Sequence, residues 1–360
     1  MSDRQFVRLA RFVSIATLVA TAACGSASEE APAAAAGPSP SAPSGPTAPG
    51  TSAPSTPATT PTTPALGAPY PIVLLHGMGG FTQLQNLPID IVYFSGVKDD
   101  LAKQGEPEVF ATLAPAYDTS LERAKAIAPQ IDAILKKTGR AKVNLIGHSQ
   151  GGMDARVLAS MAGLGYGDRI ASVTTIATPH RGSKVADLVM GILDNVPAGT
   201  IDSVTSDFLS ILQKSVYQLE NDPHLRAQLV ELSEQHMTTV FNPKYTDDAR
   251  VHYSSYGGRT NYQTGVLACG SSRFPDDSSK LDAAQPLIQP TAVFLEEGVR
   301  KANDGMVTVD SARWGTFEQC VPADHLKEVG QLDPNPDPLS KFDHLAFFRS
   351  VVARIRKDGF

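Results

Sequence analysis

The chain has 360 residues, of which 42% are hydrophobic and 19% charged, a composition typical of a globular protein. Its formal net charge is −6, and the sequence has no cluster of Lys and Arg of the kind that binds nucleic-acid phosphates. These features argue against a nucleic-acid partner and leave an enzyme or a binding domain as the alternatives.

Residues 1–24 have the pattern of an export signal. Three arginines precede an apolar run from residue 12 to residue 23. A helix needs about 20 apolar residues to span a bilayer, so this run is too short to do so. Cleavage after a small-x-small site at 20–22 would give a secreted protein. We favour cleavage before Cys24, which would then be acylated and would anchor an exported lipoprotein at the outer membrane or cell surface.

Residues 25–69 consist mainly of Ala, Pro, Ser, Thr and Gly and contain almost no large apolar side chain. Such a segment cannot bury enough surface to offset its ordering entropy, so we expect a linker. The remaining residues, 70–360, have a length that fits one large catalytic domain.

Short apolar runs alternate with helical patterns in the first part of this domain. The runs predict strands at 71–75, 109–113, 142–146 and 173–177. The apolar spacing predicts helices at 121–137 and 150–162. Strands that alternate with helices form a parallel sheet, so the fold class is α/β, a mostly parallel sheet flanked by helices.

The pattern changes after the fourth strand. Between residues 185 and 237, apolar residues recur at helical spacing without a strand signal, and a strand pattern returns at 252–258. We expect amphipathic helices inserted between two strands. Most of them would pack on the sheet, and the region of about 183–240 would form a helical lid whose apolar face meets lipid.

A motif for nucleophilic catalysis lies in the segment VNLIGHSQGG, residues 143–152. A buried strand, a G-x-S-x-G sequence and a helix start follow one another, which is the pattern of a nucleophile elbow. The sharp turn would hold Ser149 in a strained backbone conformation that exposes its hydroxyl. Side chains at Gly147 and Gly151 would strike the neighbouring strand and helix, so these positions need glycine.

An attacking serine produces an oxyanion, which needs two aimed N–H donors. The first predicted donor is the backbone N–H of Gln150, at the start of the following helix. The second is Met78, in the loop HGMGG at residues 76–80. His76 comes too early in the chain order to be the base and is predicted to be a structural hydrogen-bonding residue.

The chain order of such triads is serine, acid, histidine. Asp304 lies in a predicted turn, and His325 follows it about twenty residues later. Asp304 would orient the imidazole of His325, which would accept the serine proton and return it to the leaving alcohol.

Several other residues could take these two roles. The competing acids and bases are Asp310, Asp282, Asp324, His344 and His252. The spacing of 342–355 predicts a terminal helix with His344 in its first turn, which argues against that histidine. His180, directly after a strand, is predicted to be structural and to fix the entry to the inserted helices. Cys269 and Cys320 remain as a pair in an exported domain, which favours a disulfide.

These motifs together resemble the bacterial true lipases of the pseudomonad type, within the α/β-hydrolase superfamily. The segments that carry the resemblance are 71–77, 142–152, 172–183 (SVTTIATPHRGS), 303–307 and 325–331. It implies an interfacial triacylglycerol lipase with a helical lid between the fourth and fifth strands and no cofactor. It also implies a triad of Ser149, Asp304 and His325, with Met78 and Gln150 as oxyanion donors. A polyester depolymerase, a phospholipase or an acyltransferase could use the same triad, and a surface lipoprotein could use the fold only for binding.

One position departs from this family. Its members bind a structural calcium ion near the catalytic histidine, and one aspartate ligand comes two residues after that histidine. Here this residue is Lys327, while Asp282 falls near the spacing of the other carboxylate. A cation in place of a carboxylate should remove most affinity for a hard cation, so we expect no metal and a Lys327–Asp282 pair. Family members often need a membrane chaperone to fold, which makes a folding chaperone a candidate partner.

Overall fold

The computed structural model describes residues 65–80, 93–195, 223–261, 269–274, 280–296 and 301–360. The predicted export signal, Cys24 and nearly all of the predicted linker lie outside these residues. The linker was expected to run to residue 69. Instead, Leu66 forms a bridge with Arg140 and exchanges backbone hydrogen bonds with Gly139 and Ala141, so the folded part begins a few residues earlier.

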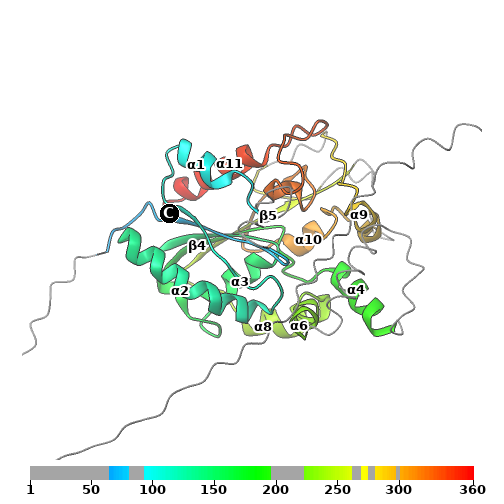
Figure 1. The fold of residues 1–360 in the computed structure, drawn as a ribbon, viewed down its shortest axis with the longest axis horizontal. Coiled ribbons are helices and arrows are strands. Elements are labelled where there is room, and N and C mark those ends of the chain that lie inside the picture. Colours follow the sequence, from blue (N-terminus) through cyan, green and yellow to red (C-terminus); the bar gives the residue numbers. More distant parts are fainter. Residues whose placement is uncertain (1–64, 81–92, 196–222, 262–268, 275–279, 297–300) are drawn as a thin grey trace, which may run out of the picture. The chain divides into compact units, whose positions relative to one another are not determined.

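A six-stranded parallel sheet forms the centre of the described part of the chain, in the order β2-β1-β3-β4-β5-β6 (Figure 1). The strands are β1 Ile72–Leu75, β2 Val109–Ala111, β3 Val143–His148, β4 Ile170–Ile176, β5 His252–Gly258 and β6 Thr316–Val321. All residues of β1, β3 and β4 are buried, which explains their continuous apolar runs. This confirms the predicted fold class, although β2 is shorter than expected and β6 was not predicted.

Helices cover both faces of the sheet, and Figure 1 shows them as two layers. On one face lie α2 (Ser120–Thr138) and α3 (Gln150–Ala159), and on the other lie α1 (Val97–Lys103) and α11 (His344–Lys357). Gly139 has φ 68° and ends α2 as predicted, whereas α3 ends three residues before the predicted 162. The fold is therefore a sheet between two helical layers.

The insertion between β4 and β5 is helical, as expected. It contains α4 (Lys184–Asn195), α6 (Pro223–Glu231), α7 (Glu234–His236), the π-helical turn η2 (Met237–Phe241) and α8 (Asn242–Lys244). The middle of the predicted lid, residues 196–222, lies outside the described residues, so a moving lid stays a prediction. No helix in the described ranges is long and apolar enough to cross a membrane.

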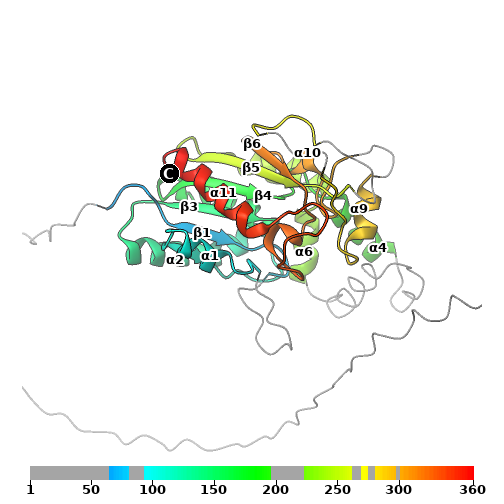
Figure 2. The same cartoon turned by 90° about the horizontal axis from the view of Figure 1, so that it is seen from above.

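The chain after β5 contributes short helices and loops. These are α9 (Gln289–Glu296), α10 (Val309–Ala312) and the 3-10 turn η3 (Lys327–Val329). Helices α9 and α10, together with α4 and α6, lie toward one end of the sheet in both views (Figures 1 and 2). Cys269 and Cys320 form the predicted disulfide, which ties the segment after β5 to β6.

Candidate active site

The turn between β3 and α3 holds Ser149 in the strained conformation that the sequence predicts. Ser149 has φ 56°, a value rarely adopted by a residue with a side chain. A Cβ atom on Gly147 would lie 2.5 Å from the backbone of Gly151, and one on Gly151 would strike the carbonyl oxygen of Leu75 on β1. The two glycines are therefore required by close approach of helix and strand, and the turn is a nucleophile elbow.

Asp304 and His325 come together as predicted, from two loops that flank β6. The Nδ1 atom of His325 lies 2.8 Å from Oδ2 of Asp304. The other carboxylate oxygen, Oδ1, accepts hydrogen bonds from the backbone N–H groups of Met306 (2.8 Å) and Val307 (2.7 Å). Asp304 is buried, and these three contacts fix its orientation, so it holds the Nδ1 edge of the imidazole.

The competing residues lie elsewhere and have other partners. His344 is the first residue of α11, and its Nε2 atom lies 2.7 Å from the carbonyl oxygen of Ser95. The carboxylate of Asp324 accepts hydrogen bonds from backbone N–H groups, and that of Asp282 faces Lys327. Of the remaining two, Asp310 has a side chain that is 67% exposed, and the ring of His252 stacks on that of Phe360.

The loop after β1 lies beside Ser149. Met78 and Ser149 line the same pocket, and Gln150 is the first residue of α3, where a helix has N–H groups without intrahelical partners. The amides of Gly79 and Gly80 donate to Ala116 and Gly77, and within the described residues no such acceptor is found for the amide of Met78. This arrangement is compatible with the predicted oxyanion donors, Met78 and Gln150.

His76 is structural, as predicted. Its Nε2 atom accepts a hydrogen bond from the backbone N–H of Ala114 at 3.1 Å, and its Nδ1 atom lies 2.9 Å from the carbonyl oxygen of Gly77. Burial and the nearby Arg123 guanidinium lower the pKa of His76 to about 4. Arg123 also donates to the carbonyl oxygen of His76 at 2.6 Å and to Asp154 at 2.9 Å. The neutral imidazole and the buried guanidinium therefore fix the loop that carries Met78.

Ser149 and His325 line one apolar pocket. Its walls come mainly from the inserted helices α4 and α6, from the loop after β1 and from the turn that follows Asp304. The lining residues are Met78, Ser149, Pro179, Ser183, Val185, Ala186, Val189, Leu229, Leu232, Met306, Val307 and His325. A pocket with this lining suits a hydrocarbon chain, because it offers apolar surface and few polar groups.

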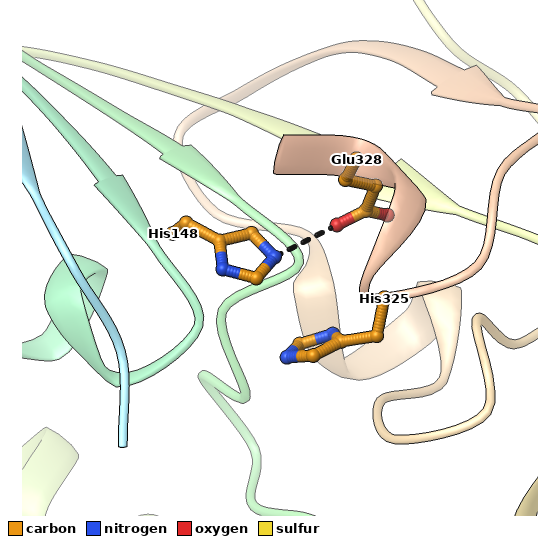
Figure 3. Close-up of side chains that lie close together, drawn as sticks. All are labelled: His148, His325 and Glu328. Atoms are coloured by element: carbon orange, nitrogen blue, oxygen red, sulfur yellow. Dashed lines mark hydrogen bonds and ion pairs between the residues drawn. The ribbon is translucent and has the colours of Figure 1, made fainter. Parts of the chain in front are cut away.

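Tyr93, His148 and Glu328 form a buried hydrogen-bonded trio next to the imidazole of His325. This trio was not predicted from the sequence. The Nδ1 atom of His148 lies 2.7 Å from the hydroxyl oxygen of Tyr93. Its Nε2 atom lies 3.1 Å from Oε2 of Glu328, and Figure 3 shows this pair beside His325. The ring of His148 is 4.5 Å from that of His325, centroid to centroid. The trio therefore joins the elbow to the loop that carries His325.

The charges of the trio are set by burial. Burial lowers the pKa of His148 well below its ordinary value, and the neighbouring His325 acts in the same direction. Burial also raises the pKa of Glu328 well above its ordinary value, helped by the negative charge of Asp304. His148, His325 and Glu328 bring potential metal-ligating atoms within 4.8 Å of one another, but both ring nitrogens of His148 and Nδ1 of His325 already have hydrogen-bond partners. This geometry fits a neutral hydrogen-bond network better than a metal centre.

His180 has the structural role that the sequence predicts. Its ring stacks on Trp314 with centroids 5.1 Å apart, and its Nε2 atom lies 3.0 Å from Oγ1 of Thr175 on β4. The side-chain amide of Asn242, at the end of the inserted helices, donates to the carbonyl oxygen of His180 at 2.7 Å. His180 therefore joins the end of β4 to the insertion.

Comparison with known proteins identifies the family of this chain. A family model described as the alpha/beta hydrolase fold matches residues 70–288. The chain is 40% identical over 295 residues to a triacylglycerol lipase of Vibrio cholerae, covering 81% of this chain and 88% of the relative. It is 29% identical over 319 residues to a triacylglycerol lipase of Burkholderia plantarii, covering 81% and 87%.

Solved structures show the same fold. The lipase of Staphylococcus hyicus superimposes with a TM-score of 0.54 and 19% sequence identity, covering 81% of this chain and 97% of that one. At this identity the likeness shows the fold alone, whereas the family model and the Vibrio relative show the family to which the chain belongs. The chain thus belongs to the bacterial lipases of the α/β-hydrolase superfamily and is a serine ester hydrolase.

Proposed function

We propose that the protein is a triacylglycerol lipase that cleaves hydrophobic acyl esters through an acyl-enzyme intermediate on Ser149. The observation that carries this proposal is the bonded Asp304–His325 pair, whose imidazole lines one apolar pocket together with the strained serine. A domain that only binds its ligand has no need of this combination. The names of the curated relatives support triacylglycerol as the substrate.

The chemistry follows from the roles of these groups. The hydroxyl of Ser149 attacks the ester carbonyl while His325 accepts its proton, and Asp304 stabilises the imidazolium that forms. The N–H groups of Met78 and Gln150 stabilise the oxyanion, a contribution of about 3 to 4 kcal/mol for each donor. His325 then protonates the leaving alcohol, and water releases the fatty acid by the same route. No step requires a cofactor.

The acyl chain would lie along the walls formed by the inserted helices. Val185 and Val189 on α4 and Leu229 at the end of α6 present apolar surface next to the nucleophile. A chain that enters this pocket must leave a lipid phase or an aggregate, so we place the working enzyme at a lipid interface.

We also propose that the enzyme is exported, with Cys24 as a lipid anchor, and that a chaperone assists its folding. The basic and apolar start of the chain and the disulfide between Cys269 and Cys320 support export, because disulfides persist in oxidising compartments. The mass of the mature N-terminus tests the anchor: a diacylated Cys24 supports it, whereas an unmodified chain that begins at Ala23 contradicts it.

Labelling with a fluorophosphonate tests the proposal at the serine. We expect stoichiometric labelling of the wild type at Ser149, with no labelling and no ester hydrolysis in Ser149→Ala. The matched control is Ser350→Ala, whose hydroxyl donates within α11 far along the chain from the elbow. A wild type that is folded but takes no label would favour a binding role.

Substrate comparison then separates the hydrolase classes. Rates on emulsified long-chain triglyceride, soluble short-chain esters, phospholipid vesicles and polyester films are measured with the same preparation. A lipase is fastest on the emulsified triglyceride. Preference for vesicles or films would instead identify a phospholipase or a polyester depolymerase with the same triad, and transfer to an added alcohol in excess of hydrolysis would identify an acyltransferase.

A further inference from the structure

A buried ammonium group lies close to the catalytic histidine. Nζ of Lys327, two residues after His325, donates to Oδ1 of Asp282 (3.1 Å), to the carbonyl oxygen of Ala283 (2.8 Å) and to Oδ2 of Asp337 (2.5 Å). The Lys327 side chain is only 13% exposed, and the carboxylates of Asp282 and Asp337 are 0% and 5% exposed. The sequence predicted the ion pair between Lys327 and Asp282, but it did not predict the ion pair between Lys327 and Asp337.

The acceptors come from segments that are otherwise separate. Asp337 holds its own turn, because its Oδ1 atom accepts hydrogen bonds from the N–H groups of Leu339 (2.9 Å) and Ser340 (2.7 Å). Beside it, the carboxylate of Asp324 accepts from the N–H groups of Lys327 (2.8 Å) and Gln285 (2.7 Å). The ammonium group therefore joins the catalytic-histidine loop to residues 282–283 and to the turn at 337–340, and Asp324 adds a bond to Gln285.

The charge of this group is maintained by its neighbours. Burial acts to lower the pKa of Lys327, but the carboxylates of Asp282, Asp337 and Asp324 outweigh it and raise this pKa above the ordinary value. The lysine is therefore a permanent cation at neutral pH. It has the role that a bound metal ion has in many loops, which is to hold several oxygen atoms together.

The donor set of this site does not fit calcium, which the family resemblance implies. Calcium takes six to eight oxygen ligands at about 2.3–2.6 Å. Here the oxygens of Asp282, Ala283 and Asp337 all surround one nitrogen, so an ion among them would overlap the ammonium group and be repelled by it. We propose that Lys327 is a built-in cation that replaces the structural calcium of this lipase family and fastens the catalytic-histidine loop without a metal.

Thermal unfolding with and without calcium tests this inference independently of any substrate. The Tm of the wild type should change by less than about 1 °C in excess chelator or in excess calcium chloride, since no calcium site is lost or filled. A wild type whose Tm falls on chelation and recovers with calcium alone would overturn the inference. Calorimetric titration of the chelated wild type should show no calcium uptake, and stoichiometric uptake would overturn it equally.

Two variants sharpen the test. Lys327→Met leaves buried carboxylates without their cation, so its Tm should fall by roughly 10 °C. Lys327→Asp adds a carboxylate where the ammonium was, so its Tm should rise with calcium concentration, while the Tm of the wild type does not. The matched control is Lys125→Met, an exposed lysine on α2, which should behave as the wild type. A Lys327→Met variant as stable as this control would show that the ammonium holds nothing together.

Discussion

Replacing Asp304 with asparagine tests the triad most directly, because the structure dictates how the amide must lie. In the wild type, Oδ1 accepts two backbone N–H bonds, from Met306 and Val307, and Oδ2 faces Nδ1 of His325. An asparagine has one acceptor and one donor end. Its oxygen must face the two N–H groups, since an NH₂ group there would meet two donors, and its NH₂ group must then face Nδ1.

The consequence is a change of tautomer. Nδ1 of His325 would have to accept a hydrogen bond, so the ring proton would move to Nε2, the nitrogen that must receive the proton of Ser149. In a Ser-His-Asp triad this change lowers kcat by roughly 10⁴. With 1.36 kcal/mol for each factor of ten, the barrier would rise by about 5.5 kcal/mol. KM should stay close to the wild-type value, because Asp304 is buried and does not line the apolar pocket.

The assay is hydrolysis of a soluble short-chain ester at saturating concentration, together with the rate of fluorophosphonate labelling and the Tm of each variant. The control is Asp310→Asn, six residues along the chain, whose side chain is 67% exposed. It should keep kcat within a factor of two. A folded Asp304→Asn variant that loses less than tenfold in kcat would refute the assignment of Asp304 as the acid.

Two further predictions concern stability. Burial raises the pKa of Glu328 well above the ordinary 4.5. Above pH 4.5 the unfolded chain therefore loses the Glu328 proton, whereas the folded protein keeps it. The contribution of this group to stability is full at low pH and is lost as the pH rises through the folded pKa. Glu328→Gln keeps a neutral partner for His148, so the difference in Tm between variant and wild type should move in favour of the variant from pH 5 to pH 8, and parallel Tm curves would contradict this. The Cys269–Cys320 disulfide spans a separation of 51 residues, so Cys269→Ser with Cys320→Ser should lower the unfolding free energy by about 4 kcal/mol in urea titration, and an unchanged midpoint would contradict it.

Most of the sheet and the nucleophile elbow could be predicted from local patterns. The strands β1, β3 and β4 are buried on both faces, so their sequences are continuous apolar runs. The edge strand β6 was missed because Glu318 and Gln319 interrupt its apolar residues; Glu318 is nevertheless buried and pairs with Arg273 at 3.0 Å. A polar residue that is neutralised by a distant partner has no local signature.

The buried trio shows the same limit within the site. Tyr93 and His148 are 55 residues apart, and His148 and Glu328 are 180 residues apart. Each of the three has an ordinary explanation when taken alone. Tyr93 could be an aromatic residue of an apolar run, His148 could be the residue before the serine in G-x-S-x-G with no role of its own, and Glu328 could be an acid on the surface. Only their common burial next to His325 shows that they form one network.

The amino-acid sequence by itself determined most of the parallel sheet and the strained turn at Ser149, because apolar periodicity and glycine geometry act over a few residues. Tertiary structure decided which aspartate meets His325, that Asp337 joins Asp282 around Lys327, and which side chains line the pocket. These contacts depend on how the crossovers of the sheet bring remote loops to one edge, and that arrangement is a property of the packed molecule as a whole.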